Sequence, residues 1–154
     1  MQKQSWKAGA FWWKLDNMLW IAIYASTDEK RLQDFQQALD NPEIKGIICT
    51  RGGYGSIRII DQLDFSAFMK YPKWIVGFSD ISVIHACLNT RLNVSSIHGP
   101  MTRDLAESEQ LIAVSRLKEV LFGQTINYEI PEHPFNRMGK AEGMLIGGNL
   151  SILT

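Results

Sequence analysis

The chain has 154 residues, of which 45% are hydrophobic and 21% charged, and its 16 basic side chains balance 16 acidic ones. This length is enough for one domain with a hydrophobic core, and the composition excludes a disordered protein. The balanced charge, without any cluster of Lys and Arg, gives no sign of nucleic-acid binding, and no apolar run reaches the roughly 20 residues that cross a bilayer. Cys49 and Cys87 fall on an expected strand and an expected helix, which indicates packed thiols in a reducing compartment, not a disulfide or a metal site.

Residues 1–25 differ from the rest, because four of the five tryptophans lie there and neither a period of two nor one of 3.6 residues persists. We predict an irregular, partly buried lead-in; an interfacial aromatic anchor and an incorrectly placed start or altered reading frame are the alternatives. Regular structure is expected from Ser26, which forms a capping-box pattern with Glu29 at the start of a helix that Asn41-Pro42 ends.

A glycine-rich loop follows the first predicted buried strand, Ile44 to Cys49. The loop reads Arg51-Gly52-Gly53-Tyr54-Gly55, and three glycines in four positions indicate a backbone with unusual dihedrals or a close neighbour. Such a loop can hold an anion or a reacting oxygen on its N–H groups, although a plain tight turn explains it equally well. It matches neither the Walker pattern nor the dinucleotide-binding pattern.

The central stretch runs from Trp74 into a helix that begins near Ile81. Trp74 to Phe78 predict a short buried strand, and Ser79 and Asp80 lie where this strand must turn into the helix. A serine at such a turn points its hydroxyl outward above the free N–H groups of the helix, which suits a nucleophile and its oxyanion. Capping of the helix by Ser79 or Asp80 is the other interpretation.

The remaining elements complete an alternation of strands and helices. We predict short helices over 57–63 and 64–69, a strand over 94–97 that His98-Gly99-Pro100 closes, and an amphipathic helix over 111–121 that ends at Gly123. This order is typical of an α/β domain with an open parallel sheet of flavodoxin- or Rossmann-like type. The glycine loop, Ser79 and His98 all follow strands, and sites in such sheets gather at the carboxyl ends of strands.

The last segment predicts a linker and the start of a truncated second domain. A strand over 140–150 enters a second glycine loop, Gly147-Gly148-Asn149, and the chain stops at Thr154 within an apolar run. We therefore expect a lead-in over 1–25, a nucleophile-bearing domain over 26–125, and the linker with the truncated domain over 126–154.

The histidines leave the serine without a convincing general base. His85 shares the apolar face of its predicted helix and is expected in the core. His98 either lines the site as a base or shapes the loop at the end of its strand, and His133 is expected in solvent. A serine hydrolase needs such a base, so this requirement is unmet by the sequence alone.

Four motifs follow one another along the chain: Arg51-Gly52-Gly53-Tyr54-Gly55, Gly77-Phe78-Ser79-Asp80, His98-Gly99-Pro100 and Gly147-Gly148-Asn149-Leu150-Ser151. In this order and spacing they resemble the LD-carboxypeptidases, a serine peptidase family that includes muropeptide-recycling enzymes and microcin-immunity peptidases. The resemblance runs from about residue 26 to 154 and covers about half of a typical family member. It implies that Ser79 is the nucleophile and that the N–H groups of Asp80 and Gly53 form the oxyanion hole. It also implies that Gly52, His98 and Asn149 bind substrate or oxyanion.

The resemblance implies a cytoplasmic serine carboxypeptidase that cleaves the amide before a terminal D-residue, as in murein tetrapeptide, with no metal and no cofactor. The family's catalytic glutamate and histidine are expected beyond Thr154, so the chain alone is expected to be inactive. The partner is a small peptide, not a nucleic acid or a membrane, and a homodimer is left open. Three alternatives stay open: a microcin-type peptidyl-nucleotide substrate, a non-enzymatic anion-binding module that uses the Gly52–Gly55 loop, and a degenerate fragment kept for association.

Overall fold

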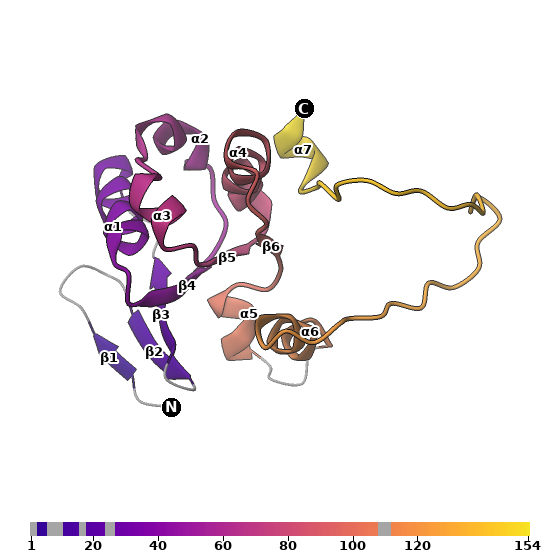
Figure 1. Cartoon of the computed structure of the whole chain (residues 1–154), viewed down its shortest axis with the longest axis horizontal. Coiled ribbons are helices and arrows are strands. Elements are labelled where there is room, and N and C mark those ends of the chain that lie inside the picture. The colour runs from indigo at the N-terminus through magenta and orange to yellow at the C-terminus, as the bar shows by residue number, and fades with distance from the viewer. Residues whose placement is uncertain (1–2, 6–10, 16–17, 24–26, 108–111) are drawn as a thin grey trace.

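The computed structural model describes residues 3–5, 11–15, 18–23, 27–107 and 112–154, and its centre is a six-stranded sheet (Figure 1). The strands lie side by side in chain order. The first three pair antiparallel and the last four pair parallel. The predicted α/β class with an open parallel sheet is therefore confirmed, with an antiparallel extension at one edge. The strands are β1 (Lys3–Ser5), β2 (Phe11–Leu15), β3 (Met18–Ile23), β4 (Ile44–Cys49), β5 (Trp74–Gly77) and β6 (Ile97–His98).

The prediction of an irregular lead-in is wrong wherever the structure describes that segment. β3 lies between β2 and β4, with Leu19 opposite Ile44 and Ile23 opposite Cys49 in a parallel ladder. The sequence of β3 is apolar throughout, as is common for strands of parallel sheets, so the alternation that marks a half-exposed strand is missing from it. A periodicity test therefore does not detect β3.

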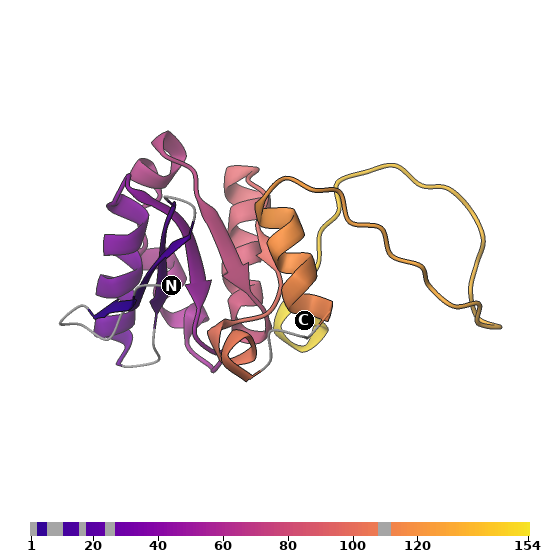
Figure 2. The same ribbon diagram turned by 90° about the horizontal axis from the view of Figure 1, so that it is seen from below.

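The helices cover both faces of the parallel strands. Figure 1 shows α1, α3 and α4 on one side of the strands and α5 and α6 on the other, and Figure 2 shows the long loop after α6 extending away from the sheet before the chain returns at α7. None of the described helices has the length and apolarity that a membrane crossing requires. The helices are α1 (Asp28–Asp40), α2 (Ser56–Ile59), η1 (Ile60–Gln62), α3 (Ser66–Lys70), η2 (Ser79–Ile81), α4 (Ser82–Leu92), α5 (Thr102–Glu107), α6 (Ile112–Leu121) and α7 (Leu150–Leu153).

Successive residues of β4 and β5 point to opposite faces of the sheet, and each face has its own cluster of buried apolar side chains. Ile47 and Ile75 are fully buried in the cluster that contains Phe68 and residues of α1 and α4. Ile48 and Val76 pack instead with Leu117 of α6 in a second, smaller cluster. Strands buried on both faces read as continuous apolar runs, which is why the strands predicted at 44–49 and 74–78 are confirmed to within one residue.

Three local predictions are wrong. The N-cap of α1 is Thr27 and not the expected Ser26: Thr27 Oγ1 accepts from Lys30 N at 3.3 Å, and Ser26 itself lies outside the described residues. The strand expected over 94–97 is reduced to β6, because Asn93 adopts φ 54° and ends α4 with Val94 N bonded to Leu88 O. The strand expected over 140–150 finds no partner among the described residues, and the chain there is exposed coil that leads into α7.

Lys73 closes the C-terminus of α1 from the start of β5. Its side chain is buried, and Nζ donates to the carbonyls of Ala38, Leu39 and Asn41 at 2.8, 2.9 and 2.7 Å. Carbonyls at the C-terminus of a helix have no hydrogen-bond donor within the helix, and they carry its partial negative charge. The ammonium group of Lys73 supplies both the missing donors and a compensating positive charge. Burial, together with the charge of Lys45, lowers the pKa of Lys73 from 10.5 to about 8.

Lys73→Met should lower the free energy of unfolding at pH 7 by about 1–3 kcal/mol, because it leaves buried carbonyls without donors. Between pH 8 and 10.5 the unfolded chain binds more protons at Lys73 than the folded chain does, so this residue makes stability rise with pH in that window. Urea titrations at pH 7 to 10.5 should therefore show wild-type stability rising relative to Lys73→Met. The control is Lys140→Met, because Lys140 is exposed in the coil after α6 and takes no part in the environment of Lys73. Parallel curves for wild type and Lys73→Met would contradict the account.

Candidate active site

Ser79 is the first residue of η2, in the strained turn that follows β5. Its φ is 59°, in the left-handed region that residues other than glycine seldom adopt, and holding a serine there costs about 1–3 kcal/mol. The caps of η2 and α4 are Phe78 and Ile81, and neither helix start has a side-chain capping bond. The predicted strand–turn–helix is confirmed, and the capping interpretation of Ser79 and Asp80 is wrong.

The main chain of Ser79 is held while its hydroxyl is left open. Ser79 N donates to Asn149 Oδ1 at 3.2 Å, and the carbonyl of Ser79 accepts from Ser82 N. No residue in the part of the chain that the structure describes bonds the Ser79 hydroxyl. A fixed backbone with an uncommitted hydroxyl is what a serine nucleophile needs before its base and substrate arrive.

The glycine loop touches the serine at one position. A Cβ on Gly52 would lie 3.0 Å from Ser79 Cβ and 3.2 Å from Ser79 Oγ, so only glycine leaves this approach undisturbed. A Cβ on Gly53 would meet nothing within 4 Å. Gly52 is therefore the residue that packs against Ser79, while Gly53 stands clear with its surroundings open.

The carboxylate of Asp80 binds the same loop. Asp80 is 7% exposed, and its Oδ2 accepts from Gly55 N at 3.1 Å, from Ser56 N at 3.0 Å and from Ser56 Oγ at 2.9 Å. From the sequence, only an N–H donor and a capping role are predicted for Asp80, and the contacts of its carboxylate are missed. The signal that could have indicated them is an acidic residue beside a turn, together with a glycine-rich loop that is rich in main-chain donors.

Asn149 brings the end of the chain to the serine. Besides accepting from Ser79, its own N–H donates to Ser82 Oγ at 2.9 Å, and its Oδ1 lies 3.4 Å from His98 Nε2. Gly148 has φ 158°, and a Cβ there would lie 2.8 Å from Ser82 Oγ. The fold thus gathers Asn149 and His98 with Ser79, although their sequence separation reaches 70 residues.

His85 is a core histidine, as expected. It is 4% exposed, and its Nε2 lies 2.9 Å from Gly77 O, which can only accept, so Nε2 carries the proton and Nδ1 accepts from Ser96 Oγ at 2.8 Å. Burial lowers the pKa of His85, so the ring stays neutral and braces the end of β5 just before the turn. His98 is exposed, and the centroid of its ring lies 6.3 Å from that of the Phe78 ring.

The cysteines supply no nucleophile. Both Cys49 and Cys87 are buried and free, as the sequence predicts. Burial, with the nearby charge of Asp80, raises the pKa of Cys49 to about 12, and burial also raises the pKa of Cys87. Thiols of this kind remain protonated at neutral pH and are poor nucleophiles. Over the described residues, no group of three or more His, Cys, Asp or Glu is placed to hold a metal ion.

A pocket of about 470 Å³ lies next to the turn, where β5 and β6 end against α6. It is mainly apolar, with Arg116, Asp104 and Tyr128 as polar members, and Phe78 and His98 connect it to Ser79. The other lining residues are Ile97, Gly99, Pro100, Ala113, Leu117, Val120 and Ile126. A mainly apolar hollow with a few polar groups is the form that small-ligand sites usually take.

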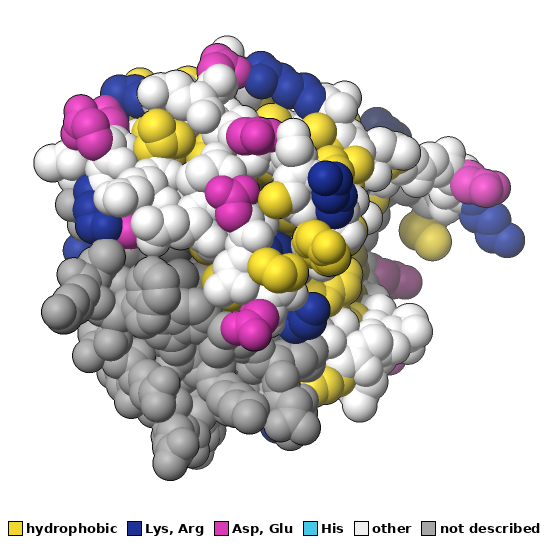
Figure 3. Space-filling view, turned by 60° about the vertical axis from the view of Figure 1, so that its left-hand side comes forward, with side chains coloured by type: hydrophobic (Ala, Val, Ile, Leu, Met, Phe, Trp, Pro, Cys, Tyr) yellow, Lys and Arg dark blue, Asp and Glu magenta, His cyan; other side chains and the backbone are white. Residues whose placement is uncertain are grey.

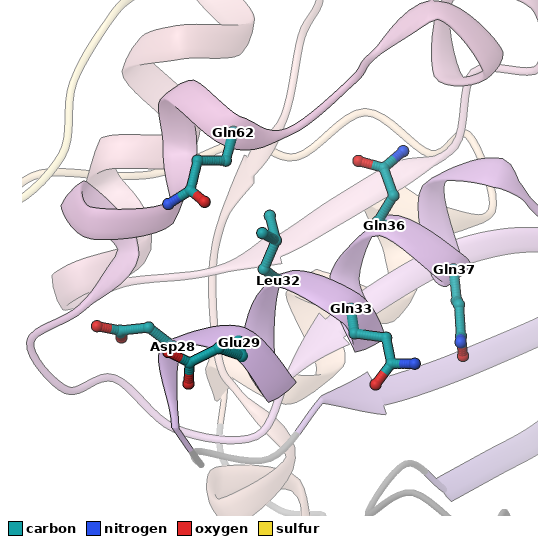
Figure 4. Close-up of a pocket in the computed structure, with 7 residues that line it drawn as sticks. All are labelled: Asp28, Glu29, Leu32, Gln33, Gln36, Gln37 and Gln62. Carbon is teal, nitrogen blue, oxygen red and sulfur yellow. The ribbon is translucent and has the colours of Figure 1, made fainter.

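A second pocket of about 420 Å³ lies along α1 and η1, and its lining consists of carboxylate and amide side chains around Leu32 (Figure 4). None of the predicted site residues lines it. Figure 3 shows acidic and basic side chains interspersed over one face of the molecule. The predicted site residues are therefore gathered around the end of β5 and not along α1.

Comparison with known proteins yields a match to the LD-carboxypeptidase N-terminal domain over residues 7–99. A probable murein peptide carboxypeptidase of Bacillus subtilis is 35% identical over 84% of this chain and 42% of its own length. A murein tetrapeptide carboxypeptidase of Pseudomonas aeruginosa is also 35% identical, over 84% of this chain and 45% of its own. A solved structure of the microcin C7 self-immunity protein with adenosine monophosphate has a TM-score of 0.65 at 24% identity, covers 83% of this chain and 47% of that one, and shows the same fold.

The chain thus spans less than half the length of the curated relatives it matches. The match also begins at residue 7, so it includes most of the segment that the sequence reading had set apart from the family.

Proposed function

Because the chain belongs to the LD-carboxypeptidase family, we propose that it carries the nucleophile of a cytoplasmic serine carboxypeptidase that removes a terminal D-residue from a murein-type peptide. The observation that carries the proposal is Ser79 itself: a serine at φ 59° at the end of a parallel strand, in contact with Gly52 and with an uncommitted hydroxyl. Strain of this kind persists where the surrounding structure enforces it, and it concentrates at functional sites. The names of the relatives support the same class of substrate.

In the proposed reaction, Ser79 Oγ attacks the carbonyl carbon of the amide that precedes the terminal D-residue. The hydroxyl proton passes to a base, the carbonyl oxygen becomes an oxyanion, and the N–H groups of Asp80 and Gly53 donate to it. Collapse of this intermediate breaks the C–N bond, and the departing amine takes the proton. Water then hydrolyses the acyl-serine and restores the hydroxyl.

The base is proposed to be a histidine oriented by a glutamate, both outside residues 1–154. Support comes from the open hydroxyl of Ser79 and from the share of the relatives' length that this chain covers. His98 is assigned a shaping role, because its Nε2 faces Asn149 Oδ1. On this proposal the 154-residue chain alone is inactive.

Incubation of the protein, as its gene encodes it, with a tetrapeptide that ends in an L–D bond should release the D-residue and leave a tripeptide, detected by mass spectrometry. The matched control is the same tetrapeptide with an all-L ending, which should stay intact. Cleavage of a peptidyl-nucleotide probe instead would favour the microcin-type substrate. Binding of inorganic phosphate with no cleavage of either probe would favour an anion-binding module and contradict the proposal.

A further inference from the structure

We propose that the carboxylate of Asp80 is a positioning group that fixes the glycine loop against Ser79; the inference rests on the proposed function. One of its oxygens, Oδ2, accepts from three donors on two consecutive residues, Gly55 N, Ser56 N and Ser56 Oγ, at 2.9 to 3.1 Å, and Oδ1 lies 3.3 Å from Gly55 N. The carboxylate is 7% exposed, so these bonds form away from competing water. Hydrogen bonds to a charged acceptor are stronger than neutral ones, and they gain further where solvent is excluded.

The loop needs such an anchor because little else in it can provide one. Three of its residues are glycines, which have the widest backbone freedom, and Tyr54 is 75% exposed. Oxyanion donors are effective only when they are held in place before the reaction begins. The bonds to Gly55 and Ser56 fix the downstream end of the loop, whereas β4 fixes its upstream end at Cys49.

The same residue fixes both sides of the proposed oxyanion hole. The main chain of Asp80 follows Ser79 directly and supplies one donor, and its side chain holds the loop that supplies the other. Gly52 packs on Ser79 between these two attachments, where an added Cβ would lie 3.8 Å from Asp80 N. The distance between the two donors is therefore set by one side chain. An amide cannot replace the carboxylate fully, because asparagine carries no charge and, with its oxygen at the Oδ2 position, turns an NH₂ group toward Gly55 N.

The test is Asp80→Asn in the protein as its gene encodes it, with kinetics on the L–D tetrapeptide and hydrogen–deuterium exchange of residues 51–58. We expect kcat to fall about 100-fold with KM changed less than about threefold, because a displaced donor is missed mainly in the transition state. The Gly55 and Ser56 amides should exchange at least about tenfold faster. The matched control is Asp34→Asn, another buried carboxylate, which pairs with Lys30 on α1 and should lower Tm without changing kcat or loop exchange.

Unchanged kcat, or unchanged exchange of the loop, in Asp80→Asn would overturn the inference. If Asp80→Asn does not fold, Ser56→Ala removes only the hydroxyl bond and should lower kcat several-fold with faster loop exchange; no effect on either would be equally contrary. If the wild-type protein does not cleave the tetrapeptide, the proposed function fails, and the exchange measurement still decides whether Asp80 anchors the loop.

Discussion

Ser79→Ala is expected to lower kcat for the L–D tetrapeptide by roughly 10⁴-fold or more, with KM little changed. The reason is that Oγ forms the covalent bond to the substrate, whereas the main-chain contacts of Ser79 with Asn149 and Ser82 survive the substitution. Because no described residue bonds the hydroxyl, its loss should leave Tm within a few degrees of wild type. Steady-state kinetics and thermal unfolding of the protein, as its gene encodes it, measure both effects.

The control for this variant is Ser115→Ala on the exposed surface of α6, where Oγ bonds only Ile112 O. It should retain wild-type kcat and KM. A Ser79→Ala variant that keeps more than about a tenth of the wild-type kcat would show that the turnover does not pass through this serine.

Gly52→Ala should lower kcat by roughly 100-fold, since a misplacement of about 1 Å at a reacting group has an effect of that order. The added Cβ would stand 3.0 Å from Ser79 Cβ and 3.2 Å from Oγ, so the serine or the loop must shift. The control is Gly139→Ala, where a Cβ would meet nothing within 4 Å, and it should leave kcat unchanged. Equal kcat in wild type and Gly52→Ala would mean that the loop does not define the position of the nucleophile.

The strands that could be predicted from the sequence are the ones whose signal is local. Ile44–Cys49 and Trp74–Gly77 are short apolar runs between turn residues, and each is buried on both faces. β3 has a similar composition, but the tryptophans around it and the absence of alternation hid it. The apolar run near residue 146 misled in the opposite direction, because a strand exists only where another strand accepts its hydrogen bonds.

The site could be predicted in part for the same reason. The position of Ser79 follows from a strand, a turn and a helix that adjoin in sequence, and the family motifs pointed to Gly52 and Asn149. The carboxylate of Asp80 binds donors 24 and 25 residues away, and Asn149 reaches Ser79 across 70 residues. Neither contact has a local signature, because both depend on how the sheet brings separate loops together at the ends of its strands.

Covalent labelling is the most direct test of whether Ser79 is a catalytic nucleophile. The protein, as its gene encodes it, would be treated with a fluorophosphonate, digested with trypsin and analysed by mass spectrometry. The phosphonyl group is expected on the peptide Trp74–Arg91, with fragment ions that place it on Ser79, and Ser79→Ala should abolish both label and turnover. Labelling confined to another residue, or full turnover by a protein whose Ser79 is replaced, would contradict this role of Ser79.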